Sequence, residues 1–340
     1  MKFHRVSPAL FRPSGTLSAL ALTSAIALAS FSPLANAQSA SSVRMYGLVD
    51  MSIGRFQAPG ARPIYGTESG KMTTSYFGFA GTEDLGGGVS AIFALESFFL
   101  ADTGGIGRFV GDVFFSRASY VGLNSGFGRV TVGRQATALF NSTLLFNSFG
   151  SSFGFSPSIR HYFTSGTVTG DSVWNDAVQY ATPKFAGFTA SVMVAPGESN
   201  GGNNVGGNVI YGAGPFAATA VYQKVAKGAT VDDSTTWQLG ASYAFEKVKL
   251  FGQHGRVQNE TTTRDYNLTE AGLSVTFASS RAMLSYGTIN PDVGPTRDTI
   301  SLGYSYLLSK RTDVYAVVMS DKIEGLSAGN NYAVGMRHSF

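Results

Sequence analysis

The sequence lacks cysteine altogether and is poor in charge. With no cysteine among its 340 residues, the chain cannot contain a disulfide scaffold, a thiolate metal site or a cysteine nucleophile. Asp, Glu, Lys and Arg make up only 14% of the chain, against roughly 25% in soluble domains, which argues against an ordinary cytosolic globule. Disorder is disfavoured as well, because 44% of the residues are hydrophobic and 13% are aromatic.

Histidine is scarce too, and the motifs of common enzymes are missing. None of the four histidines stands beside another histidine or an acid at metal-ligand spacing. Residues 66–70 (GTESG) place serine one position away from the G-x-S-x-G elbow, and residues 104–111 (GGIGRFVG) do not match G-x-G-x-x-G. We therefore expect a protein that is not an enzyme, with no catalytic, metal or cofactor-binding residues.

Residues 1–37 have the layout of a secretory signal peptide. Lys2, Arg5 and Arg12 precede an uncharged apolar stretch, and Ala35-Asn36-Ala37 supplies the small residues of a cleavage site, so we expect cleavage after Ala37. A retained membrane helix is the alternative, but serines interrupt the stretch. Removal of three bases leaves 22 bases and 21 acids, so the basic pI belongs largely to the leader and nucleic-acid binding is not expected.

Residues 38–340 contain no apolar run of the ~18 residues that a membrane helix needs, but they alternate with period two. Trp237, Leu239 and Tyr243, for example, are separated by Gln238, Gly240 and Ser242 in the pattern of a strand with one apolar face. Sixteen such segments begin near Val43, Met72, Val89, Phe114, Arg129, Asp176, Phe188, Gly207, Phe216, Thr236, Lys247, Tyr266, Arg281, Asp298, Thr312 and Asn331.

The connections between these segments alternate in length. Seven short turns, such as 83–88 (EDLGGG) and 309–312 (SKRT), alternate with eight longer polar connections. Hairpins of this kind are typical of outer-membrane barrels, whose short turns face the periplasm. We therefore predict an all-β fold, a transmembrane antiparallel β-barrel of sixteen strands; a soluble β-sandwich is the alternative, but 303 residues would be unusually long for one such domain.

Several segments resemble the Gram-negative general porins of the neisserial and β-proteobacterial type. They follow one another along the mature chain and include residues 43–50 (VRMYGLVD), 77–88 (FGFAGTEDLGGG), 116–123 (SRASYVGL), 178–188 (VQYATPKFAGF), 307–316 (LLSKRTDVYA) and 337–340 (RHSF).

The resemblance implies a single barrel domain over residues 38–340 in the cell outer membrane. It also implies a homotrimeric water-filled channel through which small hydrophilic solutes and ions diffuse passively. Outer-membrane lipid, lipopolysaccharide and the barrel-assembly machinery would be its partners, with Phe340 as a C-terminal assembly signal. A substrate-selective channel and a non-conducting barrel or adhesin remain as alternatives.

In these porins the third external loop folds into the barrel and narrows it, and residues 136–175 form a matching connection. It far exceeds the roughly 12–15 residues at which a structureless loop usually signals function. Its six phenylalanines would leave much apolar area exposed if it extended into water, so we expect it to fold into the lumen.

Charges that face the lumen would act on a permeating ion. Strand alternation and the loop supply the expected pore-lining and constriction residues, which are Arg44, Asp50, Glu96, Arg117, Arg129, Arg160 and Asp171. Arg117 also falls where the resembling porins place a constriction arginine. Arg134 has outward parity, which is costly in lipid, so we expect it at a subunit interface or at the root of the loop.

Three positions depart from the family pattern. The resembling porins often have a base where this chain has Tyr76, Ala80 and Gln179, and they often supply carboxylates from the inserted loop. Between residues 137 and 173 the only formal charges here are Arg160 and Asp171. We therefore expect an aromatic-lined constriction with a weak transverse field and only mild ion selectivity.

Overall fold

The computed structural model describes residues 41–163, 172–199, 201–226 and 231–340. The expected signal peptide and Asp171 lie outside these ranges. Among the described residues, no helix is both long and apolar enough to cross a membrane.

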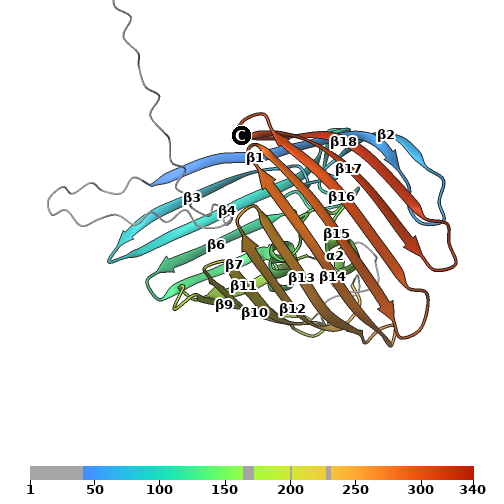
Figure 1. Ribbon diagram of the computed structural model, residues 1–340. Helices are drawn as coiled ribbons and strands as arrows, with labels where there is room; N and C mark the ends of the chain where they lie inside the picture. The colour runs from blue at the N-terminus through green and yellow to red at the C-terminus, as the bar shows by residue number, and fades with distance from the viewer. Residues whose placement is uncertain (1–40, 164–171, 200, 227–230) are drawn as a thin grey trace, which may run out of the picture. The chain divides into compact units, whose positions relative to one another are not determined.

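Sixteen antiparallel strands form a sheet that closes on itself, as the alternation predicts (Figure 1). The first and last strands close it, with Asp50 opposite Arg337. The wall strands are β1 (Ser42–Phe56), β3 (Tyr76–Gly86), β4 (Val89–Leu100), β6 (Ala118–Ser125), β7 (Gly128–Ala136), β8 (Val173–Ala181), β9 (Phe188–Ala195), β10 (Asn204–Ala213), β11 (Phe216–Val225), β12 (Ser234–Phe245), β13 (Val248–Asn259), β14 (Arg264–Phe277), β15 (Ser280–Pro291), β16 (Arg297–Leu307), β17 (Thr312–Ile323) and β18 (Gly329–Ser339).

Burial along the strands is the reverse of that in a soluble protein. In β12 the apolar side chains Trp237, Leu239 and Tyr243 are exposed on the outer face. The polar side chains Thr236 and Gln238 point inward and are buried. A wall that is apolar outside and polar inside matches a barrel surrounded by lipid. The seven short turns lie where the sequence predicts them, whereas three connections at the opposite end, 260–263, 292–296 and 324–328, are short as well.

Two further strands were not predicted. The two-residue β5 (Gly105–Ile106) pairs only with the end of β4. The longer β2 (Ile64–Ser69) pairs with residues 51–56 of β1, and β3 pairs with residues 42–48 of the same strand. Strands β2 and β3 therefore occupy one position in the wall, interrupted at residues 70–75. The carboxylate of Asp50 holds this interruption, accepting hydrogen bonds from the backbone N–H groups of Met72 and Thr73, each at 2.7 Å.

The seam of the barrel extends to the last residue. The backbone N–H of Phe340 donates to the carbonyl of Gly47 at 3.1 Å, and the reverse bond is 3.2 Å long. A Cβ atom at position 47 would lie 2.5 Å from Cζ of the Phe340 ring, so glycine allows the ring to cover β1. The terminal residue therefore takes part in closing the sheet; its role in assembly stays a prediction.

The long connection between β7 and β8 carries two short helices, α1 (Ala138–Leu145) and α2 (Pro157–Phe163). Helix α1 contacts β9 to β12, and α2 contacts β14 to β16. Figure 1 shows α2 within the ring of strands rather than beyond its rim. The described part of the connection therefore lies along the inner wall, as expected for a loop folded into the lumen.

The outward position of Leu239 predicts a cost for charge on that face. Leu239 is 54% exposed near the middle of β12, where it would contact lipid. Leu239→Arg should lower the free energy of unfolding by roughly 2–4 kcal/mol, because an arginine at the bilayer midplane is poorly solvated. Reversible urea unfolding in lipid vesicles measures this, with Leu239→Ala as the control for the lost leucine. Equal stability of the two variants would contradict an outward side chain at this depth.

Candidate functional site

Polar side chains of the inner wall hold helix α1. The amide of Asn208 on β10 donates to Ser142 Oγ at 2.9 Å, and Ser142 Oγ lies 3.2 Å from Thr219 Oγ1 on β11. On β12, Gln238 donates through Nε2 to Thr143 Oγ1 at 2.9 Å. These three consecutive strands each present one buried polar group to the helix, so α1 is fixed to the wall by side-chain hydrogen bonds.

The next two strands hold the turn between the helices and the start of α2. On β13, Gln253 Nε2 donates to the carbonyl of Phe146 at 3.2 Å and to Ser158 Oγ at 3.1 Å. On β14, the Glu270 carboxylate accepts the backbone N–H of Ser158 at 2.9 Å and the hydroxyl of Ser285. The buried carboxyl group of Glu270 thus ties the loop to two strands at once.

An ion cluster fastens the far side of α2. Asp321 on β17 accepts Arg160 of α2 at 2.8 Å and Arg297 of β16 at 2.7 Å, and its own side chain is fully buried. Beside it, His161 Nε2 lies 2.9 Å from Thr299 Oγ1. Burial, reinforced by the positive charge of Arg297, lowers the pKa of His161 to about 3. The imidazole is therefore neutral at physiological pH.

Apolar contacts also attach the loop to the inner wall. At these contacts the inner face of the wall is apolar rather than polar. Phe149 and Phe155 are buried in a cluster with the inward side chains of Met283, Val317 and Met319. A second cluster joins the loop residues Ala138, Leu139 and Tyr162 to the inward residues Val221, Val257, Tyr266, Leu268 and Ile289. The wall is thus apolar at these positions beneath the loop, where its side chains do not face water.

Three other phenylalanines of the loop are only half-buried and contact one another. The rings of Phe140 and Phe153 stack with centroids 5.8 Å apart, and Phe163 meets Phe140 edge-on at 5.3 Å. Of the six phenylalanines in the loop, Phe146, Phe149 and Phe155 therefore bind the wall, while this trio retains accessible surface. The position of this trio agrees with the aromatic-lined constriction that the sequence predicts.

The predicted charged residues fall into two groups. Arg44 and Arg129 point inward from β1 and β7, as alternation predicts, and retain accessible surface. Arg117 precedes β6, so the alternation of that strand does not place it. Its guanidinium nevertheless reaches the interior, where it bonds the Glu96 carboxylate and lies 4.1 Å from the centroid of the Tyr76 ring.

Two predicted pore-lining charges serve to hold the structure instead. Asp50 points inward but is fully buried, because two backbone N–H groups and the Tyr315 hydroxyl, at 2.7 Å, enclose its carboxylate. Arg160 is turned toward the wall by Asp321. Arg134 faces outward and donates to the carbonyl of Ser116 at 2.9 Å and to Asn175 Oδ1 at 2.5 Å, beside the root of the loop.

The close approach of the loop predicts the effect of one added methyl group. A Cβ atom at Gly303 would lie 2.9 Å from the Phe149 ring, so Gly303→Ala should push the loop away from β16. Overpacking of this kind costs roughly 1–3 kcal/mol. We expect a lower free energy of unfolding and a smaller single-channel conductance. Gly212→Ala is the matched control, since nothing lies within 4 Å of a Cβ there. Identical behaviour of both variants would show that the loop does not press on β16.

The neutral state of His161 predicts a pH dependence. The pKa of His161 is about 3 when the side chain is buried against the wall and 6.5 for an ordinary histidine. Between these pH values His161 therefore binds a proton only when the loop has detached from the wall. Anchoring of the loop should therefore weaken as pH falls from 6.5 toward 3, by up to about 1.4 kcal/mol per pH unit. His161→Gln should show a smaller loss of thermal stability than the native protein between pH 7 and pH 4. Parallel curves would rule out this titration.

Comparisons with known proteins agree with this geometry. A family model described as Gram-negative porin matches residues 21–326. Outer membrane porin protein 32 of Delftia acidovorans is 30% identical over 93% of this chain and 99% of its own length, and an outer membrane porin protein of Bordetella pertussis is 27% identical over 94% and 99%. The structure of an anion-selective porin from Comamonas acidovorans has a TM-score of 0.78 at 26% identity, covering 88% of this chain and 100% of that one. The chain belongs to the Gram-negative porin family and forms a diffusion channel in the outer membrane.

Proposed function

We propose that this channel conducts small hydrophilic solutes with a mild preference for anions. The observation that carries the proposal is a set of inward bases near the short-turn end of the wall, here called the basic ring: Arg44, Arg129, Lys249 and Arg281. Within the described residues, none of the four has a carboxylate oxygen within 4 Å.

Five inward carboxylates of the wall are, by contrast, either paired with a base or buried and hydrogen-bonded. Glu96 bonds Arg117 and the Tyr46 hydroxyl, and Asp313 accepts Arg337 at 2.8 Å. Asp50, Glu270 and Asp321 are buried and hydrogen-bonded, as described above. An ion in the lumen therefore meets bases whose field is not cancelled at short range. The anion selectivity named for the Comamonas acidovorans porin supports the same reading.

The preference is mild because the loop adds little free charge. Arg160 shares Asp321 with Arg297, and the surface that the loop keeps accessible includes the uncharged rings of Phe140, Phe153 and Phe163. We infer that the loop narrows the lumen sterically, while the basic ring biases which ions pass. Screening reduces that bias at high salt, where the Debye length falls to roughly 3 Å at 1 M.

We further propose the processing and assembly that the family implies. Residues 1–37 would be removed on export, and residues 38–340 would assemble as a homotrimer. Outer-membrane lipid and lipopolysaccharide would surround the apolar wall, and the barrel-assembly machinery would read the chain end at Phe340. The exposed apolar outer face and the paired terminal residue support this assignment.

Reversal potentials in planar bilayers test the ion preference. Under a KCl gradient we expect a modest excess of chloride over potassium permeability. The double variant Lys249→Glu, Arg281→Glu should shift the ratio toward cations by at least about twofold, because it replaces two positive charges in a confined lumen. Lys322→Glu is the matched control, since Lys322 is exposed on the outer face of β17. A cation-preferring native channel, or equal shifts in the variant and the control, would contradict the proposal.

A further inference from the structure

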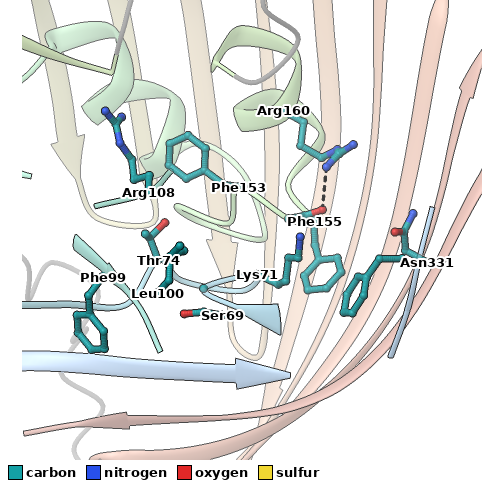
Figure 2. A pocket seen from close by; sticks show the side chains of 13 residues that line it. Ser69, Lys71, Thr74, Phe99, Leu100, Arg108, Phe153, Phe155, Arg160 and Asn331 are labelled. Carbon is teal, nitrogen blue, oxygen red and sulfur yellow. Dashed lines mark hydrogen bonds between the residues drawn. The ribbon is translucent and has the colours of Figure 1, made fainter. Parts of the chain in front are cut away.

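A cavity of about 260 Å³ lies between the loop tip and the interruption of β2 and β3. Figure 2 shows Lys71 and Phe155 on one side of it, with Phe153 and Arg108 on another. The loop is bonded to the interruption, since the carbonyl of Lys71 accepts Ser152 Oγ at 2.8 Å and the N–H of Gly154 at 3.0 Å. The cavity walls are therefore fixed relative to one another.

The charged residues that line this cavity are all basic. Lys71, Arg108 and Arg160 contribute to the lining, and no carboxylate side chain does. The acids that pair with the two arginines lie behind them, because the side chain of Asp112 is 5% exposed and that of Asp321 is 0% exposed. An anion in the cavity would meet the cationic groups first.

The cationic groups of the lining differ in how firmly their printed partners hold them. Arg160 bonds the buried carboxylate of Asp321, which also accepts Arg297. Lys71 pairs with Glu68 at 3.2 Å, but both side chains are about one-third exposed, where such a pair is weak. An entering carboxylate can therefore compete for Lys71.

The uncharged part of the lining includes five apolar side chains, four of them aromatic, beside the polar residues Ser69, Thr74 and Asn331. Phe56, Leu100, Phe153 and Phe155 contribute to it, and the Lys71 ammonium lies 5.1 Å from the Phe56 ring centroid. Phe153 is half-buried and already stacks on Phe140, so its ring is held in place with accessible surface. Such a ring can stack on a second flat ring without first being ordered.

We propose that this cavity is a binding site for small aromatic monocarboxylates of about the size of benzoate. The carboxylate would lie toward Lys71, and the ring would stack on Phe153 on the side of the cavity that also bears Arg108. The cavity is smaller than the roughly 300–1,000 Å³ of drug-sized sites, which limits the ligand to a single ring. The inference rests on the proposed anion-conducting channel, to which it adds a preferred class of solute.

Block of the chloride current by added solutes tests the site in the full-length mature channel. Benzoate, acetate and benzamide separate the contributions of ring and charge. The half-blocking concentration of benzoate should be roughly 3- to 10-fold lower than that of acetate, as expected for one aromatic contact. Benzamide, which has the ring but no charge, should block less than benzoate. Equal block by benzoate and acetate, or by benzoate and benzamide, would overturn the proposal.

Variants at the ring and at the charge identify the site. Phe153→Leu keeps an apolar side chain for packing and should bring the benzoate and acetate values together. Lys71→Gln should raise both values. Phe185→Ala is the control, because Phe185 lies in a turn outside the lumen and is 82% exposed. An unchanged benzoate preference in Phe153→Leu would place the site elsewhere. Each half-blocking concentration is compared with the chloride conductance of the same variant. A native protein that conducts no chloride would contradict the proposed channel itself.

Discussion

The closed ring of backbone hydrogen bonds is the constraint on which the rest of this structure depends. Lipid offers no partners to N–H and C=O groups, so a sheet in a bilayer has to pair its first strand with its last. Here β1 pairs with β18, and Phe340 extends that pairing to the chain end over Gly47. Once the ring is closed, strand alternation sends apolar side chains to lipid and polar ones to the lumen.

The inward side chains then fall into two classes, those that bind the loop and those that keep accessible surface in the lumen. Where α1 and α2 cover the wall, Asn208, Gln238 and Glu270 bond the loop, and the inward apolar residues pack against it. Where the loop is absent, inward side chains such as Arg44 and Arg129 keep accessible surface. Position along the strand thus decides which side a residue faces, and the loop decides whether that residue holds structure or faces solvent.

This division explains which features of the structure can be predicted from the sequence. Alternation and turns predict sixteen strands and the inward direction of Asp50 and Arg129, because both depend on local backbone geometry. The same alternation cannot show that Asp50 is enclosed by residues 72 and 73 and by Tyr315, since those contacts join distant segments. The apolar inward residues Val317 and Met319 were a usable signal, as they contradict a wholly polar lumen.

The one-sided attachment of the loop has a consequence for the route of a solute. The helices contact the wall from β9 to β12 and from β14 to β16, and the tip reaches Lys71. The inner wall from β3 to β7 lies on the other side of the barrel from these contacts. A solute that passes between the loop and that wall meets two unlike surfaces, the phenyl rings of the loop on one side and the wall that bears Arg117 and Tyr76 on the other.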